Sequence, residues 1–225
     1  MATIHDDLWA EKVAALLPKG PDDALPKAKQ QALAKALQEW TALHVMRELE
    51  AVLHEHERPE LMPLLSDESW TVQSKGKRFL GALRWQEVDV WLTNPETGLA
   101  LAVDPKHFQS EKSFDKNWKN GLNDLVAFST NLHERFPACA VGGFISFPEW
   151  ATRPPSLRQI HSICARAIPR DRPLNAYGKF EGLGLAVYGA DGHLVWPFKA
   201  DSPLKPSRAF RGLAAALYTR TLSLL

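Results

Sequence analysis

The feature that most constrains the fold is an apolar run that ends abruptly in charged residues. Residues 99–103 are all apolar; Asp104 follows directly, and Lys106 comes two positions later. An uninterrupted apolar run is typical of a strand that is buried on both faces of a sheet. The sequence therefore predicts a central strand over residues 99–108 whose end carries a carboxylate and an ammonium group out of the core.

The patterns on either side of this run predict helices around a mixed sheet. Pro95 and Gly98 suit a tight hairpin turn directly before the central strand. Helices are expected at residues 6–17, 27–56, 114–135 and 155–167 and from 207 onward, and strands at 70–83 (a pair or a bent strand), 87–94, 138–147, 182–189 and 193–198. This order predicts an α/β (α+β) fold in which helices flank a central mixed sheet.

Length and composition predict one folded domain over residues 1–225. The chain is 45% hydrophobic and 24% charged, which is ordinary for a globular protein. We expect a helical part at about 1–60 and a basic part at about 151–225.

No apolar run approaches the roughly 18 residues of a membrane helix, and the N-terminus lacks a signal-peptide layout. Two cysteines, Cys139 and Cys164, are too few for a disulfide framework, so we expect reduced thiols and a cytoplasmic location.

Charge is segregated along the chain although the net charge is only +1. Residues 1–150 hold 16 basic and 22 acidic residues, whereas residues 151–225 hold 11 basic and 4 acidic residues. A basic C-terminal part on an acidic body is compatible with binding to a polyanion. An ordinary solvated surface explains the same distribution equally well.

Three charged residues are predicted to meet at the end of the central strand. Asp104 and Lys106 share one face, because side chains at i and i+2 of a strand point the same way. Asp89 lies in the preceding strand of the hairpin and can reach the same place. Two aspartates suit Mg²⁺, which prefers oxygen ligands, and the lysine could orient or deprotonate an attacking water.

These residues resemble the motif of the PD-(D/E)xK nuclease superfamily, in particular type II restriction endonucleases. The resemblance covers residues 70–148, with Asp89 and Asp104 matching the two acids and Lys106 matching the lysine. It implies a core of helix, three strands, helix and strand, and Mg²⁺-dependent hydrolysis of double-stranded DNA. It also implies that the backbone carbonyl of Pro105 helps to hold the metal. Enzymes of this type that cut both strands commonly work as homodimers, which is the expected assembly here.

Other residues are weaker candidates for the same site. Glu87 shares the face of Asp89, and Glu48 on the long helix could add a third carboxylate, although solvated charges explain both. His107 is expected on the opposite face from Lys106. His54 and His56 do not share a helix face, so we interpret them as a solvated helix end. Trp85 and Trp150 lie near loops and could stack on a base.

Two groups of basic residues are candidates for contacts with DNA. The first group precedes the predicted strand that carries Asp89 and consists of Lys75, Lys77, Arg78 and Arg84. The second group lies in the basic C-terminal part and consists of Arg153, Arg158, Arg166, Arg170 and Arg172.

Three functional hypotheses remain open from the sequence. The first is a metal-dependent DNA endonuclease of restriction type. The second is a non-catalytic DNA-binding or interaction module with a nuclease-like fold, since Val88 stands where the family often has proline and Pro105 removes a strand amide. The third is an unrelated α/β enzyme. Asp89 and Asp104 could then be ordinary strand-end acids, with Lys106 in a weak surface ion pair.

Overall fold

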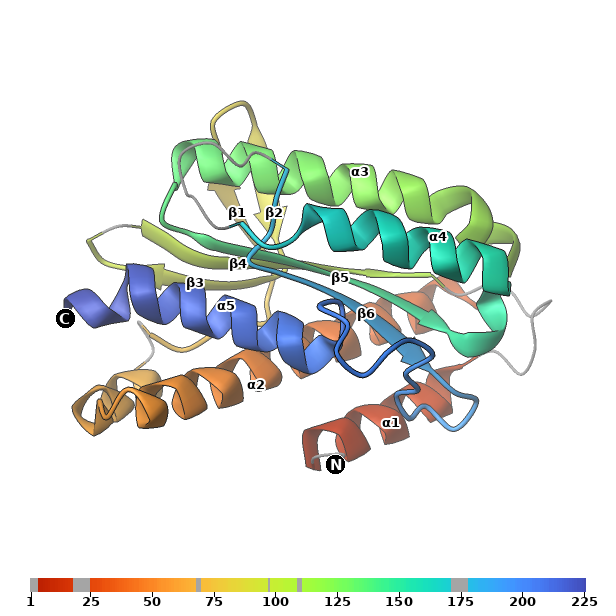
Figure 1. Ribbon diagram of the computed structural model, residues 1–225, viewed down its shortest axis with the longest axis horizontal. Coiled ribbons are helices and arrows are strands. Elements are labelled where there is room, and N and C mark those ends of the chain that lie inside the picture. Colours follow the sequence, from red (N-terminus) through yellow and green to blue (C-terminus); the bar gives the residue numbers. More distant parts are fainter. Residues whose placement is uncertain (1–3, 18–24, 68–69, 97, 109–110, 171–177) are drawn as a thin grey trace.

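A mixed four-stranded sheet forms the middle layer of the protein, and helices cover both of its faces (Figure 1). The computed structural model describes residues 4–17, 25–67, 70–96, 98–108, 111–170 and 178–225. The strand order is β3-β4-β5-β6, in which β3 and β4 are antiparallel and β4, β5 and β6 are parallel. The α/β (α+β) class expected from the sequence is therefore confirmed.

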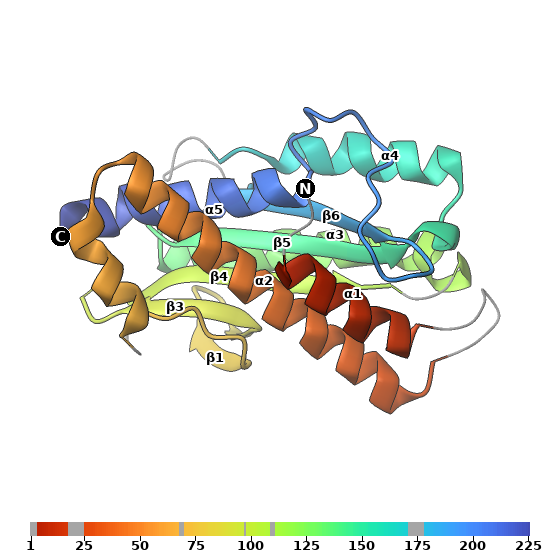
Figure 2. The same ribbon diagram turned by 90° about the horizontal axis from the view of Figure 1, so that it is seen from below.

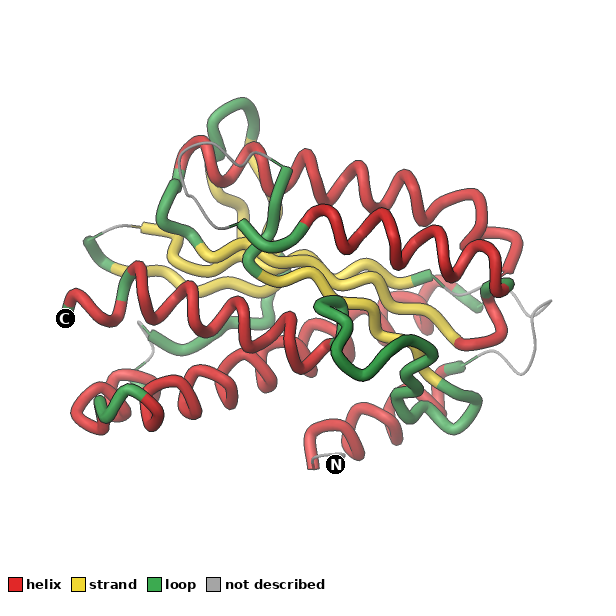
Figure 3. Tube along the Cα trace, viewed as in Figure 1, coloured by secondary structure: helices red, strands yellow, loops and turns green. Residues whose placement is uncertain are grey.

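Helices occupy both ends of the chain, and strands are concentrated in its middle (Figure 3). The helices are α1 (Ile4–Leu16), α2 (Lys27–Glu55), α3 (Glu111–Arg135), α4 (Pro154–Cys164) and α5 (Pro206–Arg220), with short 3₁₀ turns at Pro59–Ser66, Glu149–Ala151, Ala165–Ala167 and Leu222–Leu224. The strands are β1 (Lys77–Leu80), β2 (Trp85–Val88), β3 (Val90–Asn94), β4 (Gly98–His107), β5 (Ala140–Pro148) and β6 (Gly182–Tyr188). Among the described residues, no helix is both long and apolar enough to span a membrane.

Two apolar cores lie on opposite faces of the sheet. Helices α1, α2 and α5 cover one face (Figure 2), and α3 and α4 cover the other. Trp40 and Phe210 anchor the first core, and Trp118 and Phe128 anchor the second. Cys139 and Cys164 are buried, unpaired members of the second core.

The segment 87–94, expected as one strand, is two strands that meet at Asp89. β2 pairs with β1 in a separate two-stranded ladder, whereas β3 pairs with β4 from Val90 opposite Val103 onward. Residues i and i+2 of a straight strand share a face. Val88, however, is buried in the core of α3, and Val90 in the core of α2. The strand therefore rotates at Asp89, and the expectation of one regular strand is wrong.

The order of the other elements agrees with the expected core. Counted with β2 and β3 as one bent strand, α2 is followed by three strands, α3 and β5. The segment 70–83 forms β1 and an isolated bridge between Gln73 and Trp91. The strand expected at 193–198 is wrong, because only Leu194 forms a bridge there, with Tyr188. Pro197 has no amide hydrogen to extend a ladder.

A buried ionic network ties the last helix to the ends of β5 and β6. Glu181 accepts hydrogen bonds from Arg220 (2.7 Å), Arg170 (3.0 Å) and the amide of Val141 (2.7 Å), and its carboxylate lies 3.2 Å from His133 Nε2. Burial alone would raise the pKa of Glu181. Its hydrogen bonds and the neighbouring positive charges instead hold that pKa at about 2. The expectation that Arg170 contacts DNA is therefore wrong, because this side chain is buried in the network.

We expect Glu181→Gln to destabilise the fold by about 3–5 kcal/mol at pH 7, because it leaves the buried Arg170 without its counter-ion. Urea denaturation measures the effect, and Asp191→Asn in the exposed pair with His193 is the control, with a cost below about 1 kcal/mol. The Glu181 contribution should persist at any pH above its ordinary pKa and disappear as the pH falls toward 2. Equal stability of the two variants at pH 7 would contradict this role of Glu181.

Candidate active site

The candidate site lies where β4 continues past the start of β3. The β3–β4 ladder ends at Val90 opposite Val103, while β4 remains paired with β5 through His107. One side of β4 therefore has no strand partner in the main sheet from Asp104 onward. This explains how Pro105 fits into a central strand, since a proline is tolerated where its missing amide faces no partner strand.

Asp104 and Lys106 form an ion pair at this end of β4. Lys106 Nζ lies 2.7 Å from Asp104 Oδ2, as their common strand face predicts. The Asp104 side chain is only 8% exposed, whereas that of Lys106 is 33% exposed. The ion pair therefore joins a buried carboxylate to a lysine side chain that reaches toward solvent.

The second oxygen of Asp104 has no hydrogen-bond partner among the described residues. Asp104 Oδ1 is buried and accepts no hydrogen bond from any part of the chain that the structure describes. Burial raises the pKa of Asp104, and the charge of Lys106 opposes that rise. A buried carboxylate oxygen without a donor is costly for a fold, so this oxygen is a candidate ligand atom.

Asp89 lies beside this pair, at the bend between β2 and β3. Its pKa is raised to about 6, first by burial and then by the negative charge of Asp104, while Lys106 lowers it. The Gln38 side chain of α2 also hydrogen-bonds the Asp89 carboxyl group and lowers its pKa. The structure therefore brings Asp89, Asp104 and Lys106 into one electrostatically coupled group between α2 and α3, as the spacing predicts.

Two further acids add negative charge around the aspartates. Glu87 raises the pKa of both aspartates, and Asp124 of α3 raises that of Asp104. A Cβ atom on Gly76 would lie 3.1 Å from Glu87 Oε1 and 3.9 Å from Asp89 Oδ1, so these oxygens border the same small space. Glu87 is exposed and stays a candidate for an outer position around a cation.

The donor set fits a cation held by two carboxylates. Across the described ranges, no three His, Cys, Asp or Glu side chains gather closely enough to hold a metal by themselves. The expected set has only two carboxylates, from Asp89 and Asp104, and a backbone carbonyl, from Pro105. The buried Asp104 Oδ1, which has no donor among the described residues, and the neighbouring Asp89 carboxylate are hard oxygen donors of the kind that a divalent cation binds.

His107 points to the other face of the sheet, as expected. Its ring lies 3.2 Å from both Ser146 Oγ and Tyr188 Oη, and burial lowers its pKa to about 4. Tyr188 belongs to the core of α1, α2 and α5, so these contacts are part of the core packing.

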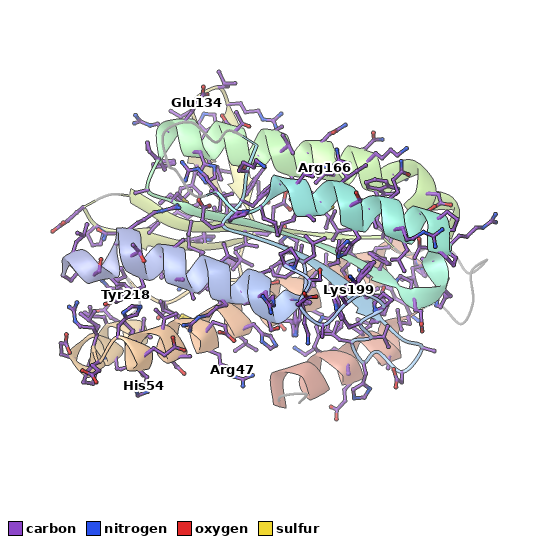
Figure 4. All side chains as sticks on the ribbon, in the orientation of Figure 1. Arg47, His54, Glu134, Arg166, Lys199 and Tyr218 are labelled. Carbon is purple, nitrogen blue, oxygen red and sulfur yellow. The ribbon has the colours of Figure 1, made fainter. Side chains whose placement is uncertain are left out.

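In the part of the chain that the structure describes, the histidines at the end of α2 belong to no cluster of three potential metal ligands. His54 is exposed and points away from α2 (Figure 4), while the ring of His56 stacks on that of Tyr218 at 4.4 Å. This arrangement agrees with the expected solvated helix end.

Glu48 lies away from the aspartates. It is ten residues beyond Gln38 on α2, a distance of about 15 Å along the helix. There it lines a cavity of about 410 Å³ between α2, β6 and the start of α5, together with Trp40, Lys205 and Phe210. The expectation that Glu48 could join the site is wrong. This cavity is too small to enclose a DNA duplex, which binds across a protein surface.

The basic residues before the site strand are exposed around the β1–β2 hairpin, at Lys75, Lys77, Arg78 and Arg84. In the second group, Arg153, Arg158 and Arg166 are exposed, Arg170 is buried, and Arg172 lies outside the described residues.

Trp85 is 57% exposed, whereas Trp150 packs against the core of α3 and α4. Of the two tryptophans considered for base stacking, Trp85 is therefore the accessible one.

Comparisons with known proteins leave the family open. No protein-family model matches the chain, and neither a curated protein nor a solved structure matches it. The assignment of chemistry to this site therefore depends on the geometry of its residues.

The sequence did not reveal Gln38, Asp124 or Asn131 as residues around the site. Nothing in the sequence pattern of α2 or α3 distinguishes Gln38 or Asp124 from other polar helix residues. They lie near the aspartates only because of the way in which these two helices pack on the sheet. Asn131 had a detectable signal, because it lies three residues after Phe128, on the apolar stripe of α3. It is 2% exposed and bonds the β1–β2 turn.

We expect Asp89→Asn to be more stable than the wild type at pH 8 in EDTA. The folded protein holds the Asp89 proton more tightly than the unfolded chain does, so the ionised carboxylate destabilises the fold above about pH 6. The gain should shrink through pH 6 and vanish near pH 4. Denaturant unfolding across this range measures it, with the exposed Glu50→Gln as the control. A less stable Asp89→Asn at pH 8 would contradict the electrostatic interpretation.

Proposed function

We propose that this protein is a Mg²⁺-dependent endonuclease that hydrolyses phosphodiester bonds of double-stranded DNA, as restriction-type enzymes do. The observation that carries the proposal is the group at the end of β4. A buried Asp104 with one partnerless oxygen lies 2.7 Å from Lys106 and is coupled to Asp89. This combination of two acids and a lysine is the one that the PD-(D/E)xK motif predicts.

Each residue has a distinct role in this proposal. Asp89 and Asp104 would hold the cation, together with the carbonyl of Pro105. A bound Mg²⁺ supplies Lewis acidity and lowers the pKa of a coordinated water. Lys106 is the most exposed of the charged pair, so its ammonium group can leave Asp104 to hydrogen-bond the attacking water and the scissile phosphate. Gln38 is a positioning residue, because it fixes the Asp89 carboxylate.

The substrate and assembly follow from the charge and from the number of sites. Exposed basic side chains on the β1–β2 hairpin border the acidic site and can neutralise phosphates on either side of the cut. One chain holds one such site, so cleavage of both strands requires two chains or two successive nicks. We propose a homodimer acting in the cytoplasm. Sedimentation that finds only monomers on DNA while both strands are cut together would contradict the dimer.

The test is cleavage of plasmid and linear DNAs by purified protein with Mg²⁺ or EDTA. We expect discrete fragments with Mg²⁺ and none with EDTA. Asp104→Asn removes a ligand charge, and Lys106→Ala removes the group that orients the water, so each should lower the cleavage rate about 100-fold or more. His107→Gln, on the other sheet face, is the matched control and should cut at close to the wild-type rate.

Binding assays separate this function from the alternatives. Both site variants should still bind DNA with a salt-dependent affinity, because the basic surface is intact. DNA binding without any cleavage by the wild type would favour the non-catalytic DNA-binding module. Cleavage by Asp104→Asn or Lys106→Ala at the wild-type rate would place the active site elsewhere.

A further inference from the structure

We infer that the outer face of the β1–β2 hairpin contacts the bases of the bound DNA, with Leu83 and Trp85 entering or covering the base stack while arginines hold the flanking phosphates. This inference rests on the proposed function, because it assumes that DNA is the ligand. The proposed function assigns the residues that act on the phosphate, and this inference adds the element of the fold that contacts the bases.

The hairpin exposes apolar side chains that the fold does not use. The register pairs Leu80 with Trp85 and Arg78 with Glu87, and opposite residues of a ladder share a face. Leu80 is 49%, Trp85 57% and Leu83 in the turn 81% exposed. The opposite face of the hairpin carries Phe79 and Val88 and packs on the core of α3. The hairpin therefore has one face that packs on the fold and one exposed face, on which the apolar Leu80 and Trp85 lie beside Arg78 and Glu87.

The turn that presents Leu83 is held rigidly. The buried Asn131 of α3 accepts hydrogen bonds from the amides of Leu83 (2.8 Å) and Arg84 (3.3 Å), and its own amide donates to the carbonyl of Arg84 (3.1 Å). Its backbone carbonyl also accepts a bond from the amide of Ala82. A Cβ atom on Gly81 would lie 2.3 Å from the Asn131 side chain, so glycine permits this close contact. An exposed leucine on a turn fixed in this way is ordered in advance for binding.

The two arginines beside the exposed apolar side chains favour nucleic acid as the partner, although Glu87 lies opposite Arg78 on the same face. Arg84 adjoins Leu83 in the turn, and the Arg78 guanidinium lies 5.9 Å from the ring centre of Trp85. Cations that border exposed aromatic and aliphatic side chains are typical of surfaces that neutralise phosphates and stack on bases.

The position of the hairpin fits the proposed cut site. Asp89 lies six positions after Leu83 in the sequence, which is at most about 20 Å of extended strand, or roughly six base-pair steps of a duplex. The turn of the hairpin reaches beyond α3 (Figure 1), so the sheet and its helices do not cover it. One duplex can therefore touch the hairpin and reach the acidic site together. Insertion there would unstack bases at a fixed distance from the cut phosphate.

The test is binding to duplexes that carry 2-aminopurine, a base whose fluorescence rises when it is unstacked, at successive positions. Leu83→Ala with Trp85→Ala in one chain should weaken the affinity about tenfold or more and abolish the fluorescence rise. Trp85→Phe should retain most of both. Leu224→Ala, which alters an equally exposed leucine at the other end of the chain, is the control and should behave as the wild type. All variants are measured with Ca²⁺ in place of Mg²⁺, and thermal melting checks their folding.

The outcomes separate this inference from the proposed function. If the wild type cuts DNA but the hairpin variant binds and unstacks it normally, the hairpin role is overturned and the nuclease stands. If the hairpin variant loses binding but the wild type never cuts, the hairpin role stands and the nuclease is overturned. If the hairpin variant instead loses only self-association, the apolar face is a protein interface and the inference is overturned. A wild type that binds no DNA overturns both.

Discussion

The ion pair between Asp104 and Lys106 is the interaction on which the candidate active site depends. It places a carboxylate inside the protein at the end of an apolar strand, with only one of its two oxygens paired. An ion pair of this kind stabilises little by itself, because desolvation of the acid offsets the attraction. Lys106 therefore balances the Asp104 charge only in part, and the proposed Mg²⁺ would balance the remainder.

The rest of the fold holds this unfavourable group in place. The sheet fixes Asp104 through the β4–β5 ladder, α2 fixes Asp89 through Gln38, and α3 closes the other side. The bend at Asp89 has two effects, since it brings this carboxylate to Asp104 and directs β1 and β2 outward as a separate hairpin. The contrast with Glu181 is instructive, because that buried acid has three cationic or imidazole partners and a lowered pKa. Both oxygens of Glu181 are paired by the fold, whereas Asp104 has one oxygen without a partner among the described residues.

Much of the fold could be predicted from the sequence because its strands are short, apolar and separated by clear turn signals. The run that ends at Asp104 has no plausible place outside a central strand, and the spacing to Lys106 sets their common face. The break at Asp89 could not be predicted, because the alternation of residues 87–94 is also that of a regular strand. The contacts of Gln38 with Asp89 and of Arg170 with Glu181 depend on tertiary packing. Exposed and buried arginines look alike in a sequence, which is why Arg170 was assigned to the wrong role.

The proposed binding of a divalent cation by Asp89 and Asp104 can be measured by calorimetric titration of the protein with Mg²⁺ at pH 8. We expect Mg²⁺ to bind the wild type with an affinity that weakens as the pH falls below about 6, where Asp89 takes up its proton. Asp104→Asn should lose this binding, whereas Lys106→Ala should retain it. Equal Mg²⁺ affinity in the wild type and Asp104→Asn, or no binding to the wild type at any pH, would contradict the account.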